Sequence, residues 1–152
     1  VPHDFGYFEL ETQSGENTWE ESFATFGNIS RAIKKRASFY IYRSLILSED
    51  ALNAYGQKNN SLITVYNQSK EAYYNPDFYL IKHLSHFLKG ESHIIKYQDN
   101  EGLTVAFQLH NGKTVIFVLN PLKRQKQVKI KWDKKMLELI LDAESFNTLV
   151  IG

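Results

Sequence analysis

The hydrophobic periodicity of the chain changes near Gly90, and this change restricts the fold more than any other feature. Before it, helical repeats alternate with short apolar runs, a pattern typical of βαβ units. After it, only short alternating segments remain, at residues 92–98, 103–109, 114–120, 127–132, 137–141 and 147–151. Six strands at this spacing predict an antiparallel sandwich or barrel. We therefore expect an α+β fold in two domains, residues 1–90 and 91–152.

The first 50 residues predict a strand, a helix and a second strand. Residues 5–10 form a short aromatic strand pattern. The helix should begin at Thr18, because Glu21 follows three residues later and completes a capping-box pattern, and it should run to about Arg36. Residues 38–47 are apolar on both alternating faces, which predicts a strand buried in a parallel sheet.

The following 40 residues predict one more strand and one more helix. Residues 62–66 are a short strand candidate, and a helix should run from Pro76 to about Leu88, with Gly90 ending it. The helix spacing predicts a buried stripe formed by Phe78, Ile81, Leu84, Ser85 and Leu88.

Charge and composition exclude several classes of function. Eighteen basic and seventeen acidic residues give a net charge of +1, too little to gather nucleic acid. The longest apolar run, residues 39–47, is too short to span a membrane. No cysteine is present, which excludes disulfides, thiolate zinc sites and cysteine nucleophiles. Localisation stays open between a secreted and a cytoplasmic bacterial protein.

Two glutamates close the first predicted strand. Glu9 and Glu11 lie before a polar turn and a helix. A carboxylate at the end of a buried strand, where a strand leads into a helix, is placed as the catalytic groups of an α/β barrel are placed. An ordinary solvated carboxylate at a strand end is the alternative reading.

A resemblance to a known family covers nearly the whole chain in register. The run from Glu9 to Glu20 resembles the nucleophile segment of glycoside hydrolase family 30, the glucosylceramidase-like enzymes. Further similarity is seen at Tyr40-Ile41-Tyr42, Tyr55-Gly56, residues 60–65, the pattern Pro76-x-Phe78-Tyr79-x-x-x-His83-x-Ser85-x-Phe87, Gly90-Glu91-Ser92, Val118-Leu119-Asn120 and Ser145-x-x-Thr148.

This resemblance implies a fold and a chemistry. The fold would be the end of a (β/α)8 barrel, its seventh and eighth strands with their helices, followed by a β-sandwich. The enzyme would hydrolyse β-glycosides with retention, as glucosylceramidases, β-glucosidases and β-1,6-glucanases do, and without a cofactor. Glu9 takes the nucleophile position, and Glu11 is the reserve candidate.

The resemblance also implies substrate-binding residues, with some departures. Tyr7, Arg43, Ser44 and Tyr55 occupy the positions that would line the sugar site. The family usually carries Trp-Asn where this chain has Arg43-Ser44, so an aromatic stacking platform is lost. Tyr55 replaces a Trp but could still stack against a sugar. Such changes suggest either a shifted substrate or a decayed site.

The second catalytic carboxylate is not found in these 152 residues. In the family it lies on the fourth barrel strand, and no segment before Phe5 could form that strand. Because the chain begins at Val1 without a methionine, we expect an upstream portion. Expected partners are therefore a β-glycoside substrate and either a second copy or a missing N-terminal barrel half. The alternative is an inactive remnant whose β-sandwich binds carbohydrate or protein.

Two further clusters have ordinary explanations. His83 and His86 lie three apart on the second predicted helix, a spacing compatible with a metal, but no third ligand is evident, so we expect no metal site. Lys129, Lys131 and Trp132 could form a modest carbohydrate or nucleic-acid surface, although the solvated face of an amphipathic strand explains them better.

Overall fold

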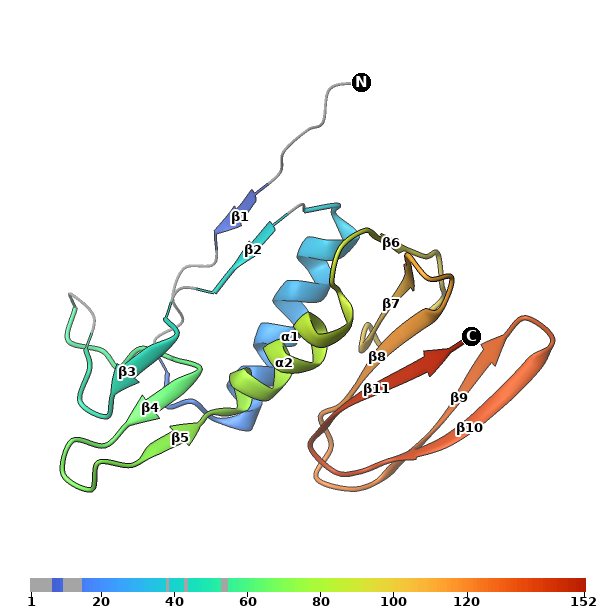
Figure 1. The fold of residues 1–152 in the computed structure, drawn as a ribbon. Coiled ribbons are helices and arrows are strands. Elements are labelled where there is room, and N and C mark those ends of the chain that lie inside the picture. The colour runs from blue at the N-terminus through green and yellow to red at the C-terminus, as the bar shows by residue number, and fades with distance from the viewer. Residues whose placement is uncertain (1–6, 10–14, 38, 43, 53–54) are drawn as a thin grey trace. The chain divides into compact units, whose positions relative to one another are not determined.

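The computed structural model describes residues 7–9, 15–37, 39–42, 44–52 and 55–152. They form an α+β fold with two helices and mostly antiparallel sheets (Figure 1). The chain divides into two compact units, residues Val1–His86 and Phe87–Gly152. No helix in the described part is long and apolar enough to cross a bilayer.

The first unit begins with a strand–helix–strand arrangement. β1 (Tyr7–Glu9) pairs in parallel with β2 (Phe39–Ile41), and α1 (Trp19–Lys34) connects them (Figure 1). The predicted order and direction of these elements are confirmed. α1 starts at the expected capping box, since the Thr18 hydroxyl accepts the Glu21 amide and the Glu21 carboxylate accepts the Thr18 amide.

The predicted long strand over residues 38–47 is wrong. β2 ends at Ile41, and a separate strand, β3 (Ile46–Ser48), pairs in parallel with β4 (Ile63–Val65) in another sheet. β5 (Ala72–Tyr74), which the sequence did not predict, is antiparallel to β4. An apolar run indicates an extended segment, but it does not indicate which strand each half of the segment pairs with. The sequence pattern therefore did not predict the break between β2 and β3.

α2 (Pro76–Phe87) confirms the second predicted helix, but only Leu84 of its predicted stripe is fully buried. The buried residues are Asp77, Leu80 and Leu84, whereas Ser85 is exposed. The buried stripe therefore begins with a carboxylate in the first turn of the helix.

The second unit is a two-layer arrangement of antiparallel strands. One layer has the order β11-β8-β7-β6, formed by β6 (Ser92–Ile94), β7 (Thr104–Leu109), β8 (Thr114–Asn120) and β11 (Ser145–Ile151). The other is the hairpin of β9 (Lys126–Trp132) and β10 (Lys135–Leu141). All six predicted strands are present.

A hydrophobic core joins the two layers. Ala106, Ile116 and Val118 from the four-stranded sheet pack with Leu141 of β10. Alternate residues of the hairpin, including Val128, Ile130 and Trp132, complete this core. Every residue of β8 is buried, so this strand is the centre of the unit.

Candidate functional site

The parallel pair β1–β2 positions the proposed catalytic strand. Its register places Glu9 opposite Ile41, at the carboxyl end of both strands. For Tyr7 and Glu9 the structure describes the backbone only, and Glu11 and Arg43 lie outside the described residues. Ile41 is 58% exposed, so the face of the strand pair that carries the Ile41 side chain is accessible to solvent.

Residues 15–17 lead into α1 and are anchored by hydrogen bonds. Gly15 donates its amide to the Lys58 carbonyl (3.0 Å), and the Asn17 side chain accepts the Ser61 amide (2.8 Å). Asn17 has a left-handed backbone (φ 57°), which asparagine tolerates better than most residues. These bonds fix residues 15–17 to the loop before β4.

Gly15 closely approaches the ends of two side chains. A Cβ at this position would lie 2.1 Å from Glu21 Oε1 and 2.5 Å from Asn60 Oδ1. Glu21 Oε1 also accepts the Glu16 amide at 3.0 Å. A side chain at residue 15 would therefore require the ends of the Glu21 and Asn60 side chains to move.

Of the other residues predicted to line the sugar site, Ser44 and Tyr55 lie within the described part of the chain. The Ser44 carbonyl accepts the Leu62 amide at 3.1 Å, so Ser44 lies beside the start of β4. Tyr55 is 88% exposed.

A buried acid that the sequence analysis did not select lies on the helix side of β2. Asp77 is 4% exposed, and its Oδ2 accepts the Tyr42 hydroxyl (2.7 Å) and lies 3.2 Å from Thr25 Oγ1. Its Oδ1 and the buried hydroxyl of Tyr40 have no hydrogen-bond partner. The sequence signal was an acid at residue 77, three and seven residues before Leu80 and Leu84, on the stripe that the helix buries.

Burial and the neighbouring Asp77 together raise the pKa of two tyrosines. Burial raises the pKa of Tyr42 well above its ordinary value, and the charge and hydrogen bond of Asp77 raise it further. Burial and the Asp77 charge also raise the pKa of Tyr40. Both phenols therefore remain protonated at neutral pH, and that of Tyr42 serves as a donor.

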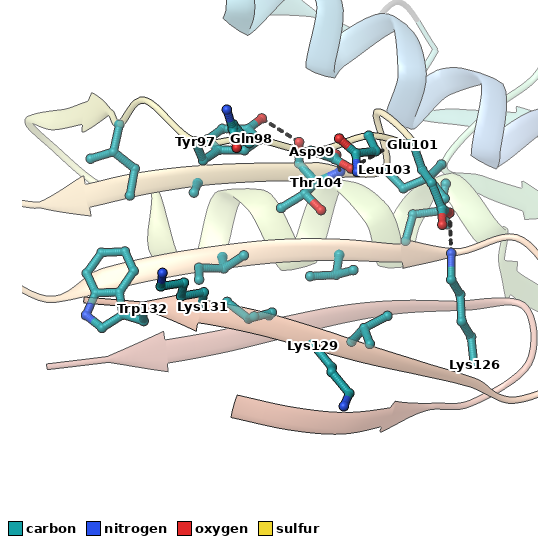
Figure 2. Close-up of a pocket in the computed structure, with 18 of the residues that line it drawn as sticks. Tyr97, Gln98, Asp99, Glu101, Leu103, Thr104, Lys126, Lys129, Lys131 and Trp132 are labelled. Carbon is teal, nitrogen blue, oxygen red and sulfur yellow. Dashed lines mark hydrogen bonds and ion pairs between the residues drawn. The ribbon is translucent and has the colours of Figure 1, made fainter. Parts of the chain in front are cut away.

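The second unit contains a groove of about 940 Å³ beside β9 (Figure 2). Its floor is aliphatic, formed by Ala106, Ile116 and Val118. Trp132 packs against the core, and Lys126 and Lys129 form ion pairs with Glu101 and Glu138. These contacts leave Trp132 in the core as a packing residue, which disfavours the surface that we considered for Lys129, Lys131 and Trp132.

Metal ligands do not converge in the described part of the chain. No group of three or more His, Asp or Glu side chains there could hold an ion. Burial and the neighbouring Lys82 lower the pKa of His83.

The fold as a whole is that of an α+β chain in which a βαβ unit precedes a layered antiparallel unit. No protein-family model matches the sequence, and no curated protein matches it. Solved structures do match the fold. SrfJ from Salmonella typhimurium superposes with a TM-score of 0.77 at 19% identity, over 93% of this chain and 32% of that chain.

Two further solved structures have named activities. The endo-β1,6-glucanase BT3312 matches with a TM-score of 0.64 at 19% identity, over 81% of this chain and 29% of that one. The catalytic domain of GH30 xylanase C from Talaromyces cellulolyticus matches with a TM-score of 0.66 at 15% identity, over 98% of this chain and 39% of that one. The chain thus spans about a third of the length of these structures, with which it shares a fold.

Proposed function

We propose that the chain is the C-terminal part of a retaining β-glycoside hydrolase of the family 30 type, which hydrolyses O-glycosyl bonds when complete. The observation that carries this proposal is the parallel β1–β2 pair with Glu9 at its carboxyl end. The fold similarity to a β-1,6-glucanase and a GH30 xylanase supports it. In this proposal β1, α1, β2 and α2 are the last part of a (β/α)8 barrel, and residues 91–152 are the β-sandwich domain.

The proposed chemistry divides between this chain and residues outside it. Glu9 attacks the anomeric carbon and forms a glycosyl ester, with Glu11 as the reserve nucleophile. A second carboxyl group, which retaining enzymes hold about 5 Å away, protonates the leaving oxygen and then activates water. Tyr7, Arg43, Ser44 and Tyr55 line the sugar site, and the substrate is a β-glucoside, a β-xyloside or a β-1,6-glucan.

Covalent labelling tests the nucleophile. The natural polypeptide that contains these residues is incubated with 2-deoxy-2-fluoro-β-glucosyl and β-xylosyl fluorides, which form a slowly hydrolysed ester, and the labelled peptide is mapped by mass spectrometry. We expect the label on Glu9. Glu9→Gln should abolish labelling and lower turnover by at least about a thousandfold, as loss of a nucleophile does.

Glu11→Gln and Glu20→Gln are the matched controls, since both remove a nearby glutamate. Both variants should still be labelled. A label on Glu11 would exchange the two roles. No label on either residue, in a polypeptide that binds the sugar, would favour the alternative, an inactive remnant acting as a binding module.

The isolated 152-residue chain gives a second test. Because the acid/base carboxyl group lies outside it in this proposal, we expect no turnover of aryl β-glucosides. Turnover that disappears in Glu9→Gln would contradict this division of the catalytic groups.

A further inference from the structure

Asp77 joins three elements of the first unit. It lies in the first turn of α2, and its Oδ2 accepts the Tyr42 hydroxyl at 2.7 Å and lies 3.2 Å from Thr25 of α1. Tyr42 directly follows β2, so the carboxylate ties the end of that strand to both helices. At 4% exposure the contact is removed from water, which strengthens it.

The anchored strand end lies next to the proposed nucleophile. Ile41, the residue before Tyr42, is the register partner of Glu9. The β1–β2 pair is only three residues long, and its main-chain bonds alone fix its position weakly. Contacts to the helices must therefore supply much of the precision with which this strand end is held.

Simple packing does not explain a carboxylate at this position. Burying an acid costs free energy unless donors compensate it. Here the compensation is the Tyr42 phenol and the amino-terminal end of α2, whose dipole favours a negative charge. One oxygen, Oδ1, is still without a partner, so the cluster retains a cost that an apolar residue would avoid.

We propose that Asp77 is a positioning residue of the proposed active site, which anchors the carboxyl end of β2 and thereby holds the strand that carries Glu9. This inference rests on the proposed role of Glu9. Asp77 acts through Tyr42 and the strand pair and does not touch the substrate.

The test removes the charge while keeping the shape. Asp77→Asn should speed amide hydrogen exchange at residues 7–9 and 39–42 by about ten- to hundredfold, the effect of losing a hydrogen bond to a charged group. Exchange in β7 and β8 of the second unit should not change. The control is Asp50→Asn, because Asp50 also accepts a hydroxyl, that of Ser48 at 2.6 Å, but is exposed.

A spectroscopic signature separates positioning from general stability. The ¹³Cζ chemical shift of Tyr42 at neutral pH, assigned with Tyr42→Phe, responds to the hydrogen bond that its phenol donates. Because Asp77→Asn replaces a charged acceptor by a neutral one, it should change this chemical shift, whereas Asp50→Asn should not. If Asp77→Asn fails to fold, Tyr42→Phe removes the same hydrogen bond by deleting its donor. It should speed amide exchange at residues 7–9 and 39–42 in the same way.

Two results would overturn the proposal: an unchanged Tyr42 signal and unchanged local exchange in Asp77→Asn, or faster exchange spread evenly over the whole chain. Neither measurement depends on glycosidase activity. A missing label on Glu9 therefore contradicts the proposed function, and unaltered exchange in Asp77→Asn contradicts the anchor.

Discussion

Gly15 shows how one residue can affect the cap of α1. An alanine Cβ would lie 2.1 Å from Glu21 Oε1, so the carboxylate would have to move away from the Glu16 and Thr18 amides. We expect Gly15→Ala to lower the free energy of unfolding by about 1 kcal/mol, the usual cost of losing a helix cap. Urea denaturation followed by circular dichroism measures it.

Gly27→Ala is the matched control. Gly27 lies inside α1, and a Cβ there meets nothing within 4 Å. The substitution should stabilise the protein by about 0.5–1 kcal/mol, because alanine loses less conformational entropy in a helix. Equal effects of the two substitutions would contradict the close approach at Gly15.

Asn120 holds together the turns of the second unit. It is 0% exposed, and its Nδ2 donates to the carbonyls of Asp142 (2.6 Å) and Arg124 (3.0 Å). Asn120→Asp removes both donors and buries a charge, so we expect a loss of about 2–3 kcal/mol in urea denaturation. Asn111→Asp should be nearly neutral, since the exposed Asn111 only accepts a bond, from the Lys113 amide.

Local partners explain which residues could be predicted. The capping box of Thr18 and Glu21 was visible because its partners lie three residues apart. Asp77 was missed because its partners, Tyr42 and Thr25, lie 35 and 52 residues away. The close approach at Gly15 likewise depends on Asn60, which only the folded chain brings near.

At the scale of elements, the sequence predicted whether a segment is a helix or a strand better than it predicted which strands pair. The turn between β7 and β8 contains the pair Asn111-Gly112, a sequence that favours hairpin turns, and Gly112 there has a φ of 80° and donates to the Leu109 carbonyl. The separation of β2 from β3 was missed because both segments are apolar and extended. Pairing is decided by tertiary packing, which a single-sequence pattern does not encode.

α2 should make stability depend on pH through His83. Its lowered pKa means that the folded state disfavours the charged imidazole, so the unfolded state binds more protons below the ordinary value near 6.5. The unfolding free energy should therefore fall as pH drops from about 7 to 5. His83→Gln should reduce this fall, and His110→Gln, in an exposed turn, should not. An unchanged pH profile in His83→Gln would contradict the assignment.

For the whole molecule, the order of elements was predictable, whereas the composition of the proposed sugar site stays a prediction. The change of periodicity near Gly90 predicted a βαβ part followed by antiparallel strands, and the structure has both. Whether Tyr55 and Ser44 meet around a sugar depends on long loops, whose conformation the sequence pattern does not specify. The division of the chain into catalytic-barrel and sandwich domains stays a prediction.

The open β1–β2 pair predicts association of the isolated chain. In the described residues neither strand pairs with a third, and the apolar side chains of Ile41, Leu45 and Ile46 are 58%, 61% and 59% exposed. Unpaired edges beside exposed apolar residues favour contact with another chain. We expect light scattering after size exclusion to give a mass above 17.7 kDa at micromolar concentration.

Ile41→Thr with Ile46→Thr should shift the protein towards the monomer, because threonine preserves strand propensity while removing apolar surface. Met136→Thr, an equally exposed site in the second unit, is the control and should leave the mass unchanged. A monomeric wild-type chain would show that these strands need no partner.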